Sequence, residues 1–76
     1  MLIQSQNNTD TYRFWGNIES RKIGTKHHIR IHSRETGWVT VGEYCSENEA
    51  KRICNEIVQS YIQRQKDIYY CPDDIA

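Results

Sequence analysis

The stretch from Ser46 to Arg64 limits the fold most, because it has the sequence pattern of a single amphipathic helix. Ser46 and Glu49 form an S-x-x-E capping box, which predicts that the helix begins at Ser46. Apolar residues then recur every three or four positions, at Ala50, Ile53, Cys54, Ile57, Val58, Tyr61 and Ile62. A helix with one apolar face has to bury that face, so the remaining segments must supply a second layer.

That layer is predicted from two segments in which apolar and polar residues alternate, as they do in strands. In HHIRIHSR, Ile29 and Ile31 point to one side of the strand. In WVTVGEY, Val39 and Val41 do the same. The intervening RETG predicts a type I turn with Gly37 in the left-handed conformation. The resulting hairpin would pair Arg34 with Trp38, His32 with Thr40, Arg30 with Gly42 and His28 with Tyr44.

Three further segments complete the predicted fold. TYRFWGNI reads as an earlier strand that ends at Gly16-Asn17, DIYYCP as a final strand stopped by Pro72, and MLIQSQ as a short first strand. We therefore predict an α+β fold in one domain, residues 1–76. It would contain a small antiparallel sheet of about four strands with one helix packed on one face, in the order ββββαβ or βββαβ.

The sheet face away from the helix is the predicted ligand-binding surface. If the isoleucines and valines above meet the helix, this open face displays His28, Arg30, His32, Arg34, Trp38, Thr40 and Tyr44, and Trp15 joins it from the earlier strand. Gly42 would leave a notch opposite Arg30 where a ligand could reach the backbone. Arginine and tryptophan side by side offer a stacking wall and hydrogen bonds to phosphate, although an antiparallel sheet with one solvated face also shows alternating polar residues.

Charge is distributed unevenly along the chain. The formal net charge is zero, which argues against nucleic acid as a general partner, because proteins that coat phosphate backbones are usually basic throughout. Residues 21–34, however, carry five Lys or Arg, three His and no acid. This segment can attract an anion although the total charge is nil.

The cellular location is predicted from what the sequence lacks. It has no apolar run long enough for a membrane helix, and MLIQSQNNTD does not have the pattern of a signal peptide. Three cysteines without a framework spacing fit reduced thiols. We expect a cytoplasmic protein that does not contact a membrane.

Neither a metal site nor catalysis is predicted. His28 and His32 lie four residues apart on one strand, roughly 13 Å at about 3.3 Å per residue, which is too far for both to hold one ion. The sequence has no paired carboxylates, phosphate loop or Ser–His–Asp set, and Cys54 lies on the apolar face of the helix. We expect no cofactor and no enzymatic activity.

Three motifs resemble one family. The opening MLIQSQN, the helix entry VGEYCSENEAKRICNEI and the ending IYYCP are similar to small accessory proteins of phages and prophages of Gram-positive bacteria. The matching positions are Gly42, Glu43, Tyr44, Ser46, Glu47, Ala50, Ile57, Tyr69 and Pro72, and the departures are Asn7, Asn48 and Cys71. The resemblance does not cover the variable stretch that includes KHHIRIHSR.

The resemblance implies a counter-defence protein acting in the bacterial host. Together with the basic, aromatic face, it leads us to expect a homo-oligomer that binds and sequesters a nucleotide immune signal, a cyclic dinucleotide or an ADP-ribose derivative. One alternative is an anti-CRISPR-like inhibitor that uses the same face to bind a host defence enzyme. Another is a module for single-stranded nucleic acid, against which the neutral charge counts.

Overall fold

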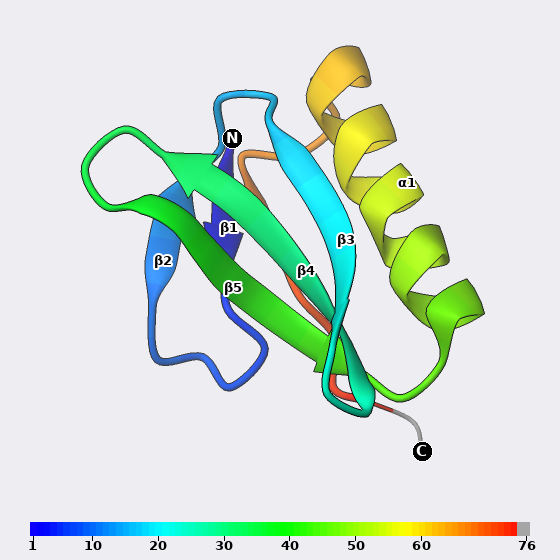
Figure 1. Cartoon of the computed structure of the whole chain (residues 1–76). Coiled ribbons are helices and arrows are strands. Elements are labelled where there is room, and N and C mark those ends of the chain that lie inside the picture. Colours follow the sequence, from blue (N-terminus) through cyan, green and yellow to red (C-terminus); the bar gives the residue numbers. More distant parts are fainter. Residues whose placement is uncertain (75–76) are drawn as a thin grey trace.

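Helix α1 spans Glu47–Gln63 in the computed structural model, which describes residues 1–74 (Figure 1). The predicted cap is confirmed, because the Ser46 hydroxyl accepts a hydrogen bond of 3.3 Å from the backbone N–H of Glu49. Arg64 caps the end of the helix: its backbone is left-handed (φ 52°), and its N–H donates to the carbonyl oxygens of Ser60 and Tyr61 in the last turn. Within residues 1–74, no helix is long and apolar enough to cross a membrane.

Within residues 1–74, six strands form two three-stranded sheets (Figure 1). The first contains β2 (Thr11–Arg13), β1 (Leu2–Gln4) and β6 (Ile68–Tyr70) in that order, with β1 antiparallel to β2 and parallel to β6. The second contains β3 (Ile18–Ile23), β4 (Lys26–Ser33) and β5 (Gly37–Tyr44), all antiparallel. The predicted α+β class is confirmed, but the strands divide into two sheets instead of one.

The chain passes from the first sheet to the second through Gly16. This residue has φ +104°, a conformation that strand residues with side chains rarely adopt. The strand TYRFWGNI, expected to end at Gly16-Asn17, already ends at Arg13. Its first part becomes β2, and its last residue begins β3. Strand β3 was not predicted, because IESRKI has isoleucine only at its two ends and is exposed from Ser20 to Ile23.

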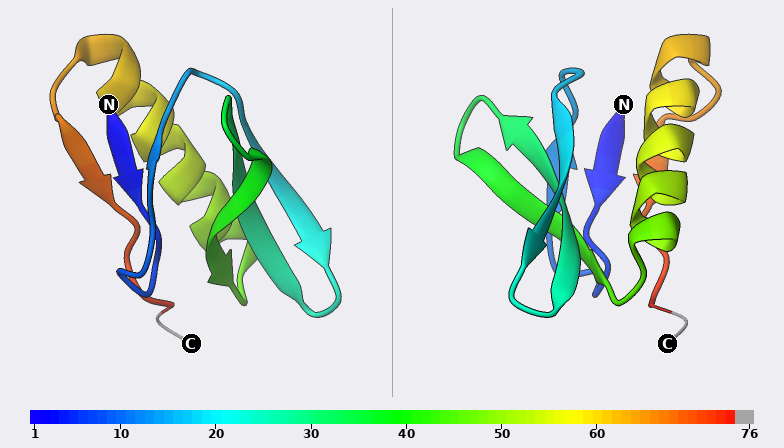
Figure 2. Two further views of the ribbon diagram at one scale, coloured as in Figure 1. Left: turned by 90° about the vertical axis from the view of Figure 1, so that its left-hand side faces the viewer. Right: turned by 45° about the vertical axis from the view of Figure 1, so that its right-hand side comes forward.

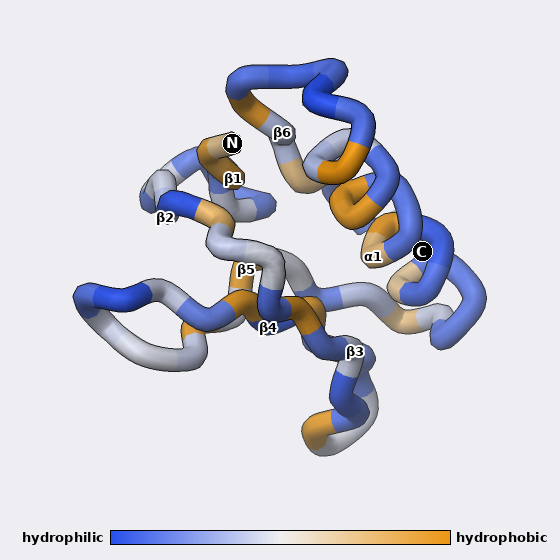
Figure 3. The backbone as a smooth tube through the Cα atoms, turned by 90° about the horizontal axis from the view of Figure 1, so that it is seen from above, coloured by the Kyte–Doolittle hydropathy of each residue, from blue (hydrophilic) through white to orange (hydrophobic). Residues whose placement is uncertain are grey.

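The core lies between the two sheets and α1, which surround it on three sides (Figures 2 and 3). The predicted inward positions on β4 and β5 are confirmed, since Ile29, Ile31 and Val41 are buried and Val39 is partly buried. The buried hydrophobic residues are Ile3, Phe14, Ile29, Ile31, Val41, Tyr44, Ala50, Ile53, Ile57, Tyr69 and Cys71. All three layers contribute to this one cluster.

The β4–β5 hairpin differs from the predicted register. Gly37 does have a left-handed backbone (φ 78°), but it pairs with Ser33, and His32 pairs with Trp38. Between the pairs Arg30–Thr40 and Ile29–Gly42, β5 contains one extra residue, Val41. Such a β-bulge shifts the alternation of the strand by one position. Beyond it, Glu43 faces outward and Tyr44 faces the core.

Because of the bulge, two predicted site residues, Tyr44 and Gly42, belong to the core and not to the open face. Tyr44 is fully buried instead of lying on the open face, and its hydroxyl donates a hydrogen bond of 2.7 Å to the carbonyl oxygen of Pro72. Gly42 does leave space beside the backbone, but the ring of Tyr44 fills it: a Cβ on Gly42 would lie 2.7 Å from Tyr44 Cε2. The notch predicted for a ligand is therefore part of the core packing.

Replacing Gly42 with alanine should destabilise the protein by about 1–3 kcal/mol, the usual cost of forcing an extra methyl group into a packed site. The Tyr44 ring cannot swing away freely, because it is buried and hydrogen-bonded. Urea unfolding measures the change, and a double-mutant cycle identifies its source. In a Tyr44→Ala background, Gly42→Ala should cost less than half as much; an equal cost would mean that the ring is not the obstacle.

Stability should also fall at alkaline pH. Burial raises the pKa of the Tyr44 and Tyr69 hydroxyls above the ordinary value of 10.0. Above that pH the unfolded chain loses protons that the folded chain keeps, so the free energy of unfolding decreases as pH rises beyond about 10 and is unaffected by these groups well below it. Urea unfolding between about pH 7 and pH 11 should show a shallower decrease for Tyr44→Phe than for the unchanged protein, and parallel curves would contradict this explanation.

Candidate functional site

The open face of the β3–β4–β5 sheet brings most of the predicted site residues together. His28, Arg30 and His32 project from β4 on the side opposite Ile29 and Ile31, and Trp38 and Thr40 project from β5 beside them. Arg34 follows β4 in the connecting turn, and Trp15 precedes β3. Gly42 and Tyr44 belong to the core, as described above.

Two predicted cationic positions have acidic partners. Arg30 Nη1 lies 3.3 Å from Glu19 Oε1, on the neighbouring strand β3. His28 Nε2 lies 3.3 Å from Glu43 Oε1, and its Nδ1 lies 3.5 Å from the Thr40 hydroxyl. The sequence did not predict that Glu19 and Glu43 lie on this face. Strand β3, which carries Glu19, was not expected, and the bulge that turns Glu43 outward was not recognised. The middle of the face is thus closer to neutral than predicted.

The aromatic residues gather at the end of the face next to the β4–β5 turn. The Arg34 guanidinium lies 3.8 Å from the centre of the Trp15 ring, and that of Arg13 lies 5.8 Å from it. His32 meets Trp38 edge to face, with ring centres 5.5 Å apart. We call these five residues the tryptophan patch. The two tryptophans are 36% and 43% exposed, although large aromatic side chains are usually buried.

Local backbone geometry explains why Trp15 reaches this face. The His32 N–H donates to the Asn17 carbonyl oxygen at 3.2 Å, which continues the β3–β4 pairing beyond the start of β3. Trp15 lies two residues before Asn17, and Arg34 lies two residues after His32, so the Arg34 guanidinium can stack on the Trp15 ring. The two tryptophans, distant in sequence, are therefore brought to one end of the sheet.

A small hollow lies at the edge of β5, beside the predicted face. It measures about 110 Å³, lies at the bulge and is lined by Ser5, Gln6, Asn7, Thr40, Val41, Gly42 and Glu43. The Gln6 side chain crosses it and makes two hydrogen bonds to the backbone of Glu43, at 2.9 and 3.1 Å. Ligand pockets usually measure about 300–1,000 Å³, so this hollow is too small to enclose a nucleotide.

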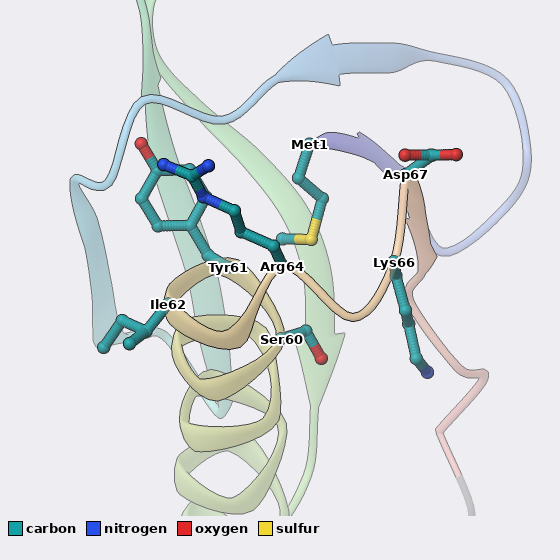
Figure 4. Close-up of a pocket in the computed structure, with 7 residues that line it drawn as sticks. All are labelled: Met1, Ser60, Tyr61, Ile62, Arg64, Lys66 and Asp67. Atoms are coloured by element: carbon teal, nitrogen blue, oxygen red, sulfur yellow. The ribbon is translucent and has the colours of Figure 1, made fainter.

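A larger pocket lies elsewhere, at the end of α1 (Figure 4). It measures about 510 Å³ and is lined by Met1, Ser60, Tyr61, Ile62, Arg64, Lys66 and Asp67, none of which was a predicted site residue. The Tyr61 ring is held there by edge-to-face contact with Phe14, with ring centres 4.9 Å apart. Its lining includes two cationic residues, one acidic residue and the carbonyl end of a helix, so its charge favours neither anions nor cations clearly.

The histidines and cysteines do not form a reactive cluster in the described residues. Across residues 1–74, no three His, Cys, Asp or Glu side chains lie close enough together to hold a metal ion. Cys45 is exposed, Cys54 is partly buried and Cys71 is buried, and all three are free thiols. Burial raises the pKa of Cys54 to about 11 and that of Cys71 to about 12, which is opposite to the activation of a nucleophilic cysteine.

Comparison with protein-family models, with curated proteins and with solved structures finds no match for this chain.

Iodoacetamide at pH 8 should modify Cys45 at least tenfold faster than Cys54 or Cys71. The thiolate is the reacting species, and each unit by which the pKa rises reduces its fraction about tenfold. A hydrogen bond to Asp74 also raises the pKa of the Cys45 thiol, but this residue is accessible to the reagent. Mass spectrometry of timed samples gives the order, with urea-unfolded protein as the control in which the three rates converge. Early modification of Cys71 in the folded protein would contradict its placement in the core.

Proposed function

We propose that this protein is a phage-derived, non-catalytic inhibitor that acts in the bacterial cytoplasm by binding a host defence protein through its tryptophan patch. The single observation that carries the proposal is the stacking of Arg34 on Trp15, at the same end of the β3–β4–β5 sheet as the exposed Trp38. The phage origin and the counter-defence role rest on the resemblance of the two ends of the sequence.

The chemistry of the patch supports a protein partner. Tryptophan and arginine are the residue types most enriched among those that dominate binding energy at protein interfaces. Stacking already restricts both side chains in the unbound protein, which lowers the entropy that binding would otherwise cost. The ion pair between Arg30 and Glu19 leaves the neighbouring surface close to neutral, as at the centre of many interfaces, where charged residues are depleted.

The shape of the surface around the patch also supports a protein partner. A small molecule binds tightly when a concave site buries most of its surface, and the hollow of about 110 Å³ beside β5 is lined by none of the patch residues. A protein partner can instead cover a flat area. The geometry therefore favours the inhibitor over the nucleotide-sequestering protein expected from the sequence.

Nucleotide sequestration stays the second candidate because of one observation. Within residues 1–74, neither Arg13 nor Arg34 has a carboxylate partner within salt-bridge distance, and both flank the Trp15 ring. Guanidinium groups beside an aromatic ring suit a phosphate and a base. Such a ligand would need a second copy of the chain, or another part of a partner, to cover it.

The proposal is tested by plating phage that carries the gene on Gram-positive hosts that each carry one defence system. Trp38→Ala and Arg34→Ala should each reduce plating on the susceptible host by about tenfold or more, since residues that dominate an interface contribute about 2 kcal/mol or more. Their melting temperatures should change by less than about 4 °C, because these side chains lie outside the core. Tyr70→Ala is the matched control: Tyr70 is 61% exposed, aromatic and outside the patch, so plating should not change.

Full protection by both patch variants would contradict the proposal. A thermal-shift panel distinguishes the other ligand classes, because a true ligand stabilises the folded state by mass action. A shift of several degrees with a cyclic dinucleotide or an ADP-ribose derivative, lost in Arg34→Ala, would replace the inhibitor with the second candidate. Binding of an oligonucleotide that weakens steeply with salt would favour a nucleic-acid module instead.

A further inference from the structure

Strand β3 (Ile18–Ile23) is an edge strand, paired with β4 on one side only. In antiparallel pairs, residues that exchange backbone hydrogen bonds alternate with residues that do not. Because the His32 N–H donates to the Asn17 carbonyl, the bonded positions on β3 are Glu19, Arg21 and Ile23. The backbone groups of the alternate positions, Ile18, Ser20 and Lys22, therefore point outward along the edge.

This edge is accessible. Ser20, Arg21, Lys22 and Ile23 are all exposed, and α1 packs on one face of the sheet rather than along this edge (Figure 3). Within residues 1–74, the outward N–H and C=O groups of the three alternate positions make no hydrogen bond to another backbone or side-chain group. A row of unpaired backbone groups is a template on which another strand can add.

We propose that the added strand is β3 of a second copy of this chain, paired antiparallel with Ser20 opposite Ser20. In this register Ile18 of each copy lies opposite Lys22 of the other copy, and the two Ser20 residues lie opposite each other. Every outward backbone N–H and C=O group of β3 then has a hydrogen-bond partner. The two chains would exchange six backbone hydrogen bonds across a two-fold axis, as expected for an isologous interface. The inference stands on the geometry of β3 and not on the proposed function.

The charges on β3 select this register. With Ser20 opposite Ser20, Glu19 of each copy lies opposite Arg21 of the other, which gives two ion pairs on the open face. Sliding the strands to the next allowed register in either direction places Glu19 opposite Glu19 or Arg21 opposite Arg21. Like charges directly opposite each other are destabilising. The sequence IESRKI is thus complementary to itself in a single antiparallel alignment.

The neighbouring side chains are compatible with this pairing. Glu19 uses Oε1 for Arg30 of its own chain, which leaves Oε2 for Arg21 of the second copy. Lysine on an edge strand often prevents association, but Lys22 lies opposite Ile18 in this register and not opposite another lysine. Its aliphatic stem can cover that isoleucine while the ammonium group stays in water.

Such a dimer has one consequence for the tryptophan patch, and this consequence alone rests on the proposed function. The two sheets would join into a six-stranded sheet whose open faces lie on the same side. Two copies of the patch would then be presented together, each with Trp15 toward the β3–β4 turn of the other copy and Trp38 toward the outer end of the sheet. A partner with two equivalent sites would bind the dimer more tightly than the single chain.

The test is the molar mass in solution, by light scattering up to about 1 mM, because an interface this small gives a weak dimer. The mass should rise with concentration from 9.1 kDa toward twice that value. Ser20→Pro should keep the mass at 9.1 kDa, because proline removes an outward N–H that the folded single chain does not use. A mass that stays at that of one chain throughout, or a dimer that Ser20→Pro does not weaken at least tenfold, would overturn the proposal.

Charge exchange provides a second arm that does not depend on how Ser20→Pro folds. Glu19→Arg alone places arginines opposite each other, and Arg21→Glu alone places glutamates opposite each other, so each variant should be monomeric. Mixed in equal amounts, the two variants regain both ion pairs and should form a heterodimer. Failure of the mixture to associate would contradict the register. Trp38→Ala should dimerise normally. The molar mass therefore tests the dimer, and plating tests the tryptophan patch, independently of each other.

Discussion

The packing of the Tyr44 ring against the bare backbone of Gly42 is the contact on which the rest of this structure depends. It occupies the point where β5 gains an extra residue and its alternation changes. The hydroxyl of the same ring holds the carbonyl of Pro72, so one side chain joins β5 to the segment after β6. Any larger residue than glycine would displace the ring and with it this connection.

The bulge also determines the chemistry of the opposite face. By turning Tyr44 inward it turns Glu43 outward, where the carboxylate meets His28. Together with Glu19 beside Arg30, this converts a surface that looks strongly basic in the sequence into one whose middle is nearly neutral. The features that stay distinctive are the stacked arginine and the two exposed tryptophans near the β4–β5 turn. They are the basis of the proposed inhibitor function.

The proposed dimer involves the β3 edge of the β3–β4–β5 sheet, whereas the proposed function involves the tryptophan patch on the open face of the same sheet. A chain of 76 residues can bury only part of its surface, and edge strands leave backbone groups exposed to solvent. Pairing through β3 would satisfy one such edge and leave Trp38, which lies on β5, uncovered. Association would then use the β3 edge of the sheet, and partner binding its open face.

The sequence by itself determined the features that depend on local periodicity. The cap at Ser46, the apolar face of the helix, the inward Ile29 and Ile31 and the left-handed Gly37 could all be predicted, because each follows from neighbours a few residues away. The α+β class followed from these elements. The outward positions of His32, Trp38 and Thr40 could be predicted from the same alternation.

Only the tertiary structure decided the hairpin register, the second sheet and the partners of the charged residues. A single extra residue at Val41 reverses which side chains face inward, and nothing in the local alternation of WVTVGEY marks it. Glu19 meets Arg30, and Arg34 meets Trp15, across strands whose pairing depends on the whole fold. Local patterns fix which residues can face the core, whereas contacts between distant segments fix which residues meet on the surface.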